Sequence, residues 1–207
     1  MILAIETSSI NYAAALCTAG EMIACRVLRR DDPAFAGIGA LVAEALALAG
    51  KEFGDIERLA VNAGPGNLGS VRAGVAYVNG LGFALHRPIL AANSLALLAL
   101  EVDQPAVLCL RNAGGGEVYA GIFPRGAMRH GPLTTVVPAL AGELAEVAVA
   151  GSFRAEAIAA LPRVSAKDSG VEYPDVLTLQ RFLSTARDAD WADVVSPINE
   201  GSAVFHE

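Results

Sequence analysis

The residues of this chain best suited to binding chemistry form a glycine-rich segment, VNAGPGNLGSVRAG, at positions 61–74. The apolar run at 59–63 predicts a buried strand that ends at this segment, and an apolar helix is expected over 70–85. A glycine loop that leads into a helix N-terminus presents backbone amides and the positive end of the helix dipole, which favour an anion. Gly64, Gly66 and Gly69 are therefore candidate phosphate-binding positions.

The segment departs from the two common phosphate-binding motifs. No lysine follows Gly69, as a P-loop requires, and His86 and Arg87 stand where a dinucleotide-binding motif has an acidic residue. A tight strand-to-helix turn, with Ser70 as the helix N-cap, explains the same residues. Both interpretations stay open.

Other polar candidates follow predicted strands. They are Glu6 and Asn11 near the N-terminus, and Asn112 and Glu117 in the second half. Glu6 could help to hold a cofactor, or it could cap amides at the end of its strand. No arrangement of serine, histidine and acid is indicated, and no histidine or cysteine pair has metal-ligand spacing. We therefore predict no catalytic residue and no metal site.

The elements that must position these residues follow the order βββαβαβα in the first half. Strands are expected at 2–5, 12–18 and 22–28, then a helix at 34–49 closed by Gly50, and the strand and helix around the glycine loop. A strand at 89–91 and a helix at 94–100 complete this half.

A boundary is expected near 101–105, which gives an N-terminal lobe at 1–103 and a C-terminal lobe at 104–207 whose tail can pack back on the first lobe. The second lobe should open with a hairpin of strands at 106–110 and 118–123. The remaining predictions are strands at 133–137, 147–150 and near 164, and helices at 139–146, 153–160 and 176–188.

The helices at 34–49 and 70–85 carry almost no charge, because Glu44 and Arg72 are their only charged residues. A helix that is apolar on all sides is normally covered on all sides. With 54% hydrophobic and only 18% charged residues, the chain is also more apolar than a solitary domain needs. We infer that both helices meet another protein surface; the alternative is that the fold itself buries them.

Bulk properties exclude several classes of protein. A net charge of −7 argues against direct binding of nucleic acid, which relies on clustered lysine and arginine. No apolar stretch is long enough to span a membrane, and the N-terminus does not resemble a signal peptide. Cys17, Cys25 and Cys109 each lie in an apolar run, as expected of buried free thiols in the cytoplasm.

Four segments together resemble the TsaB (YeaZ) family, the small subunit of the bacterial machinery that makes N6-threonylcarbamoyladenosine (t6A) in tRNA. They are ILAIETS at 2–8, GPGNLGSVRAG at 64–74, Ser94-Leu95, and GEVY at 116–119. The resemblance covers about residues 1–123 of a family formerly labelled glycoprotease, or peptidase M22-like. It implies an α/β chain with the actin-like ATPase (ASKHA) fold, built of two ribonuclease-H-like lobes with mixed sheets flanked by helices.

The resemblance also implies a cytoplasmic subunit that is not catalytic by itself. In this family a larger partner, TsaD, holds metal and nucleotide, and the ATPase TsaE completes the machinery. The small subunit forms a homodimer when alone, and reaches tRNA only through the complex. It has no cofactor of its own, although ATP or ADP and Mg can lie at the complex interface.

Site residues carried over from the resemblance fall into two groups. Glu6, Gly64, Gly66, Gly69 and Asn112 match positions that can face nucleotide. The interface with TsaD is placed on the two uncharged helices, at Phe35, Ile38, Val42, Arg72, Ala73, Gly74, Ala76, Tyr77 and Gly80.

The chain departs from the family pattern at several polar positions. Glu6 replaces the usual aspartate of the first strand, Asn67-Leu68 alters the loop, and Asn112-Ala113-Gly114 replaces Asp-Ala-Arg. These changes remove groups that could contact nucleotide. They argue against independent ATP binding and leave the partner-subunit interpretation largely intact. Two alternatives to a TsaD partner stay open: a stand-alone actin-like ATPase or kinase, and a diverged self-associating interaction module.

Overall fold

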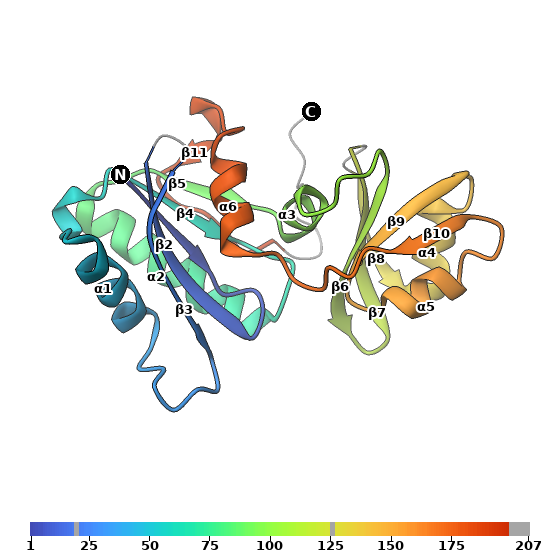
Figure 1. Cartoon of the computed structure of the whole chain (residues 1–207), viewed down its shortest axis with the longest axis horizontal. Helices are drawn as coiled ribbons and strands as arrows, with labels where there is room; N and C mark the ends of the chain where they lie inside the picture. The colour runs from blue at the N-terminus through green and yellow to red at the C-terminus, as the bar shows by residue number, and fades with distance from the viewer. Residues whose placement is uncertain (19–20, 125–126, 199–207) are drawn as a thin grey trace. The chain divides into compact units, whose positions relative to one another are not determined.

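The computed structural model describes residues 1–18, 21–124 and 127–198, which form two compact units (Figure 1). The first unit combines Met1–Ala92 with Asp175–Pro197, and the second contains Asn93–Pro174. This division differs from the predicted boundary near residue 103. Helix α3 (Ser94–Leu100) packs on strands of the second unit, whereas α6 (Val176–Leu183) packs on strands of the first. Residues 199–207 of the predicted second lobe lie outside the described residues.

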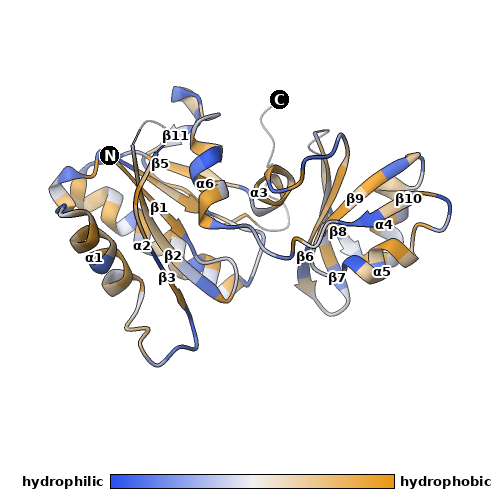
Figure 2. Ribbon diagram, in the orientation of Figure 1, coloured by the Kyte–Doolittle hydropathy of each residue, from blue (hydrophilic) through white to orange (hydrophobic). Residues whose placement is uncertain are grey.

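The first unit is built on a mixed six-stranded sheet with the order β11-β5-β4-β1-β2-β3. Its strands are β1 (Ile2–Glu6), β2 (Asn11–Thr18), β3 (Glu21–Arg29), β4 (Arg58–Asn62), β5 (Ile89–Ala92) and β11 (Trp191–Ala192). The first three strands form an antiparallel meander, and β4 and β5 continue the sheet parallel to β1. Because both faces of the central strands are covered, β1 and β4 contain the apolar runs 2–5 and 59–61, and Figure 2 colours β1 mostly as hydrophobic.

Helices cover both faces of this sheet. Figure 1 shows α1 (Ile38–Ala49) and α2 (Leu68–Leu85) on one side and α6 on the other. Helix α1 ends at Gly50, whose φ of 61° is the left-handed conformation expected of a glycine at a helix C-terminus. Gly74 allows α2 to lie against β1, because a Cβ at this position would collide with the Thr7 side chain. Short 3-10 turns lie at Phe53–Asp55 and Asp188–Asp190.

The second unit repeats the same connections in a five-stranded sheet with the order β10-β9-β6-β7-β8. Its strands are β6 (Val107–Gly114), β7 (Glu117–Phe123), β8 (Ala127–Pro132), β9 (Glu146–Gly151) and β10 (Ser165–Asp168). Helices α4 (Leu133–Ala141) and α5 (Arg154–Ala159) share one core with the sheet, and α3 packs in another. Each unit therefore has ribonuclease-H-like topology, which confirms the predicted α/β actin-like ATPase fold.

The βββαβαβα order of the first half is confirmed, and the predicted strand at 133–137 and helix at 139–146 are wrong. Residues 133–141 form the single helix α4, and β9 begins at Glu146. The β-branched run from Thr134 to Val137 favours a strand, but the apolar residues at 133, 136, 137, 140 and 141 have helical spacing and pack in the core. Strand β8 was not predicted, and α1 begins at 38 rather than 34, just after Gly37 adopts a φ of 106°.

Within the part of the chain that the structure describes, every helix falls short of the length or apolarity needed to cross a bilayer.

Candidate functional site

Glu6 and Asn62 form a buried polar cluster where β1 and β4 end. Glu6 is 2% exposed; its Oε1 accepts from the Ser8 amide at 2.5 Å, and its Oε2 accepts from Asn62 Nδ2 at 2.6 Å. Asn62 Nδ2 also donates to Ser8 Oγ at 3.1 Å, and Asn62 Oδ1 accepts from the Gly64 amide at 3.0 Å. Glu6 therefore acts in this unit as a buried cap that ties the end of one strand to the next.

The glycine loop is held from within the unit. Besides the Gly64 amide, the Asn67 amide donates to the Ser8 carbonyl at 3.1 Å, and the Ser70 amide donates to Asn67 Oδ1 at 3.1 Å. Asn67 is thus the N-cap of α2, and the prediction that Ser70 is the N-cap is wrong because Ser70 already lies inside the helix. The amides of Gly64, Asn67 and Ser70 are thus bonded within the unit, as the tight-turn interpretation expects.

Two further contacts fix the start of α2. Ser70 Oγ accepts from an Nη of Arg30 at 2.7 Å, and the Ser70 carbonyl accepts from Thr7 Oγ1 at 2.9 Å. The helix therefore begins at a position set by both the first strand and the segment after β3.

Asn112 belongs to the second unit, whereas the glycine loop belongs to the first. Its side chain is exposed, and its Oδ1 accepts from the Gly114 amide at 2.7 Å, which shapes the turn between β6 and β7. The structure therefore brings together Glu6 and the glycine loop, but gives Asn112 a local role. Among the residues that the structure describes, no group of three or more His, Cys, Asp and Glu side chains is arranged to hold a metal ion.

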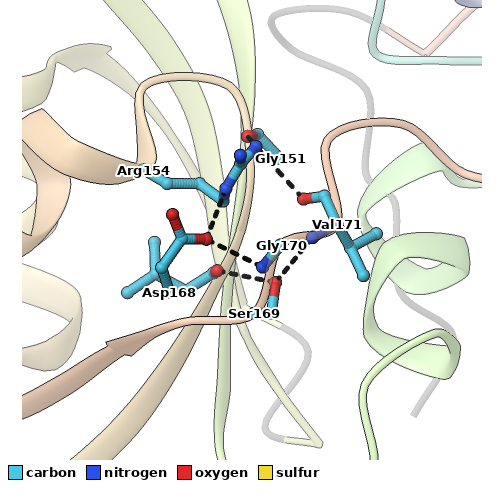
Figure 3. Close-up of polar contacts among 7 residues, drawn as sticks. Gly151, Arg154, Asp168, Ser169, Gly170 and Val171 are labelled. Carbon is cyan, nitrogen blue, oxygen red and sulfur yellow. Dashed lines mark hydrogen bonds and ion pairs between the residues drawn. The ribbon is translucent and has the colours of Figure 1, made fainter.

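The second unit has its own polar network where β9 and β10 end (Figure 3). Arg154 Nε donates to Asp168 Oδ1 at 2.6 Å, and an Arg154 Nη donates to the Gly151 carbonyl at 2.8 Å. The Gly170 amide donates to Asp168 Oδ1 at 2.8 Å; this bond first, and Arg154 second, lower the pKa of Asp168. The network fastens the segment after β10 to β9, and sequence reasoning did not find it.

The three cysteines are free thiols without the features of a nucleophile. Cys17 and Cys109 are buried and Cys25 is partly buried. Burial raises the pKa of Cys17 to about 11 and also raises the pKa values of Cys25 and Cys109. The thiolate form needed for reaction is therefore disfavoured at neutral pH.

Helices α1 and α2 leave an exposed surface of small and apolar residues, which we call the two-helix face. Its exposed members are Gly39, Ala43, Glu44, Ala47 and Leu48 on α1, and Leu68, Gly69, Arg72, Ala73, Ala76, Gly80, Phe83 and Ala84 on α2. Glu44 is paired with Arg26 Nε at 2.6 Å, so Arg72 is the main charge on this face. The alternative that this fold buries both helices completely is therefore wrong.

The predicted interface residues divide by burial. Arg72, Ala73, Ala76 and Gly80 are exposed, and Phe35, Ile38 and Tyr77 are partly buried. Val42 and Gly74 are buried against the first unit's own sheet, so a protein docked on this face would not reach them, which corrects their assignment. Leu48, 67% exposed, and Phe83, 81% exposed, were missed; the spacing of Phe83 from Gly80 and Ala76 along α2 is the signal that could have found it.

A chain with this strand order in both of its sheets is a protein of the actin-like ATPase class. The family model for TsaD, tRNA N6-adenosine threonylcarbamoyltransferase, matches residues 36–166, more than half of the 207 residues. The chain belongs to this family.

Similar proteins are of two kinds. A tRNA N6-adenosine threonylcarbamoyltransferase of Clostridium perfringens is 31% identical over 137 residues, which cover 56% of this chain and 40% of that protein. The Gluconobacter oxydans enzyme of the same name is 38% identical over 121 residues, covering 51% of this chain and 33% of that one. The chain thus spans two fifths or less of the length of these relatives.

Two solved structures instead match over almost their whole length. A Pseudomonas aeruginosa protein described as similar to peptidase YEAZ is 26% identical, with a TM-score of 0.75, covering 96% of this chain and 98% of that one. YeaZ from Pseudomonas aeruginosa is 28% identical, with a TM-score of 0.69, covering 89% of this chain and 92% of that one. The resemblance to the TsaB (YeaZ) family is confirmed.

Proposed function

We propose that this chain is a non-catalytic partner subunit in the threonylcarbamoylation of tRNA adenosine-37, and that it binds a TsaD homologue through the two-helix face. The observation that carries the proposal is this face, exposed over two helices and almost free of charge. Small residues let a second helix approach closely, and an uncharged surface loses little hydration when it is covered.

The likeness to YeaZ structures over almost their whole length supports a partner subunit of the YeaZ kind. The bonds that the Glu6 carboxylate and the Gly64 and Ser70 amides make within the unit also support a structural role for these groups. ATP or ADP with Mg would then lie at the interface of the complex, with TsaE as a further member.

The charge of the chain supports an indirect route to RNA. A protein with a net charge of −7 has little to offer a phosphate backbone, so tRNA would be held by the assembled complex rather than by this subunit alone.

Co-expression with a tagged TsaD homologue tests the proposal, with t6A in cellular tRNA as the second readout. Ala76→Glu places a charge in the middle of the two-helix face and should abolish co-elution and lower t6A. Ala139→Glu is the matched control, because Ala139 is an exposed alanine on helix α4 of the second unit. Wild type that never co-elutes with the homologue, or an Ala76→Glu variant that still does, would overturn the proposal.

Calorimetry with Mg-ATP tests the alternative of a stand-alone ATPase or kinase. The isolated chain should give no binding heat at millimolar nucleotide. Saturable heat that is lost in a Glu6→Ala variant, with the fold retained, would favour the enzyme instead.

A further inference from the structure

Strand β3 forms one edge of the sheet in the first unit. It is the last strand in the sheet order, so its outer side has no neighbouring strand among the described residues. Its nine residues include no proline and no lysine, two residues with which native proteins commonly protect an edge. A bulge, where the register with β2 shifts between Leu16 and Cys17, adds twist at one end but leaves 24–29 in regular register. This edge is therefore one that another strand can extend.

The backbone groups of Cys25 and Val27 point away from β2. The Arg30 amide donates to the Ile10 carbonyl at 2.8 Å, and the register of β3 with β2 continues from this pair without a shift as far as the bulge. In an antiparallel ladder every second residue bonds to the neighbouring strand, and the residues between them point to the opposite side. Leu28 therefore bonds toward β2, as Arg30 does, whereas the N–H and C=O groups of Cys25 and Val27 face the open edge.

The exposed side chains of β3 are arranged symmetrically about Cys25. Ile23 and Val27, two residues away on either side, are 41% and 48% exposed. Glu21 and Arg29, four residues away on either side, are exposed and opposite in charge. An antiparallel strand of the same sequence, centred on Cys25, therefore places Glu21 against Arg29 and Ile23 against Val27.

Arg29 retains donors for a further carboxylate. Its Nε and one Nη donate to Asp31, each at 2.9 Å, and both side chains are 57% exposed. A guanidinium group carries five N–H donors, so the bond to Asp31 leaves others for a second partner. The charge of Arg29 is thus available on the exposed edge.

We infer that β3 pairs with β3 of a second copy of this chain, antiparallel and centred on Cys25. A two-fold axis through this residue, perpendicular to the sheet, makes each contact twice and joins the two six-stranded sheets into one. The ion pair of Glu21 with Arg29 and the apolar pair of Ile23 with Val27 supply the side-chain contacts. The contact uses no residue of the two-helix face; it goes beyond the proposed function and does not rest on it.

Charge reversal tests this register by sedimentation equilibrium of the full chain. Glu21→Lys sets two cations against each other and Arg29→Glu sets two anions, so each variant should pair at least about 10-fold more weakly than wild type. The two variants are complementary to each other at both ends, so their equimolar mixture should pair as tightly as wild type. Glu143→Lys and Arg163→Glu are the matched controls, because they make the same charge changes at exposed residues of the second unit and should leave pairing unchanged.

Amide hydrogen exchange tests which side of β3 makes the contact. In the pair, the Cys25 and Val27 amides bond to the other copy, so their exchange should slow as the protein concentration rises. The Leu28 amide bonds to β2 in both states, and its exchange should not depend on concentration.

Three results would overturn the inference. They are wild type that stays monomeric, a wild-type dimer that neither charge reversal weakens, and exchange at Cys25 and Val27 that does not change with concentration. None of them decides the proposed function, because co-elution of the TsaD homologue with Ala76→Glu is measured separately. Conversely, wild type that never co-elutes with the homologue would reject the proposed function and leave the pairing of β3 standing.

Discussion

The two units share one strand order but treat the ends of their parallel strands differently. In the first unit the polar groups that follow β1 and β4 are buried, with Glu6 only 2% exposed. In the second unit the ion pair near the ends of β9 and β10 is more exposed, with 49% of the Asp168 side chain and 21% of the Arg154 side chain accessible. One topology therefore supports a buried network in one unit and an exposed one in the other.

The corresponding helices of the two units differ in length. Helices α1 and α2 contain 12 and 18 residues, whereas α4 and α5 contain 9 and 6. A long helix can bury one side against its sheet and still offer a continuous outer stripe. The buried anchors at the start of α2 fix this long helix in place, which suits the first unit for docking.

The largest expected difference between the units is in the stability lost when the carboxylate of Glu6 or of Asp168 is removed. Glu6→Ala leaves Asn62 Nδ2 and the Ser8 amide without their buried acceptor, and should lower the free energy of unfolding by about 3 kcal/mol. Asp168→Ala removes a solvent-exposed pair and should cost less than about 1 kcal/mol. Urea unfolding measures both values; equal losses would show that burial does not distinguish the two networks.

Replacing two glycines of α2 by alanine should change stability in opposite directions. Gly74→Ala brings a Cβ into the Thr7 side chain and should destabilise the first unit by about 1–3 kcal/mol. A Cβ added at Gly80 would meet no atom within 4 Å, so Gly80→Ala should stabilise the helix by about 0.5–1 kcal/mol. The thermal unfolding midpoints of the two variants check this prediction. A lower midpoint for both variants would contradict the assignment of Gly80 to the exposed side of α2.

The smallest expected effect is a pH dependence in the second unit. The Gly170 amide and Arg154 lower the pKa of Asp168 in the folded state, so its contribution to stability is present above the unfolded pKa of about 3.9. That contribution is lost as pH falls through the lower folded pKa. The difference in unfolding free energy between wild type and Asp168→Asn should therefore shrink below about pH 4. A difference that stays constant down to the lowest pH at which the protein folds would contradict this assignment.

Much of the first unit could be predicted because the spacing of apolar residues distinguishes its strands from its helices. Glycines also mark the ends of these elements, such as Gly50 after α1 and the glycine loop before α2. That Glu6 caps an amide at the end of its strand was one of the two interpretations of the sequence, but the side chain that shares its carboxylate could not be predicted. This side chain belongs to Asn62, 56 residues away, and the sequence does not specify that contact. The same holds for Arg154 and Asp168, which meet only because β9 and β10 pair in parallel.

The lack of charge on the two helices predicted an exposed face, but it did not predict which of their residues are exposed. Val42 and Ala43 are neighbours of similar polarity, and only the packing of α1 on the sheet makes the first buried and the second exposed. Phenylalanine is usually a core residue, but Phe83 is exposed because the other side of α2 packs on the sheet.

The path of the chain has a consequence for how the protein is made. The first unit begins at Met1, but α6 and β11, which cover its sheet and extend its edge, come from residues 176–192. On the ribosome, the segment from Asn93 to Pro174 emerges as one continuous stretch and can form its five-stranded sheet. The earlier strands of the first unit still lack α6 and β11 at that stage. The first unit therefore receives α6 and β11 only after the segment from Asn93 to Pro174 has been made, and a chain that stops at Pro174 would leave the α6 side of its sheet uncovered.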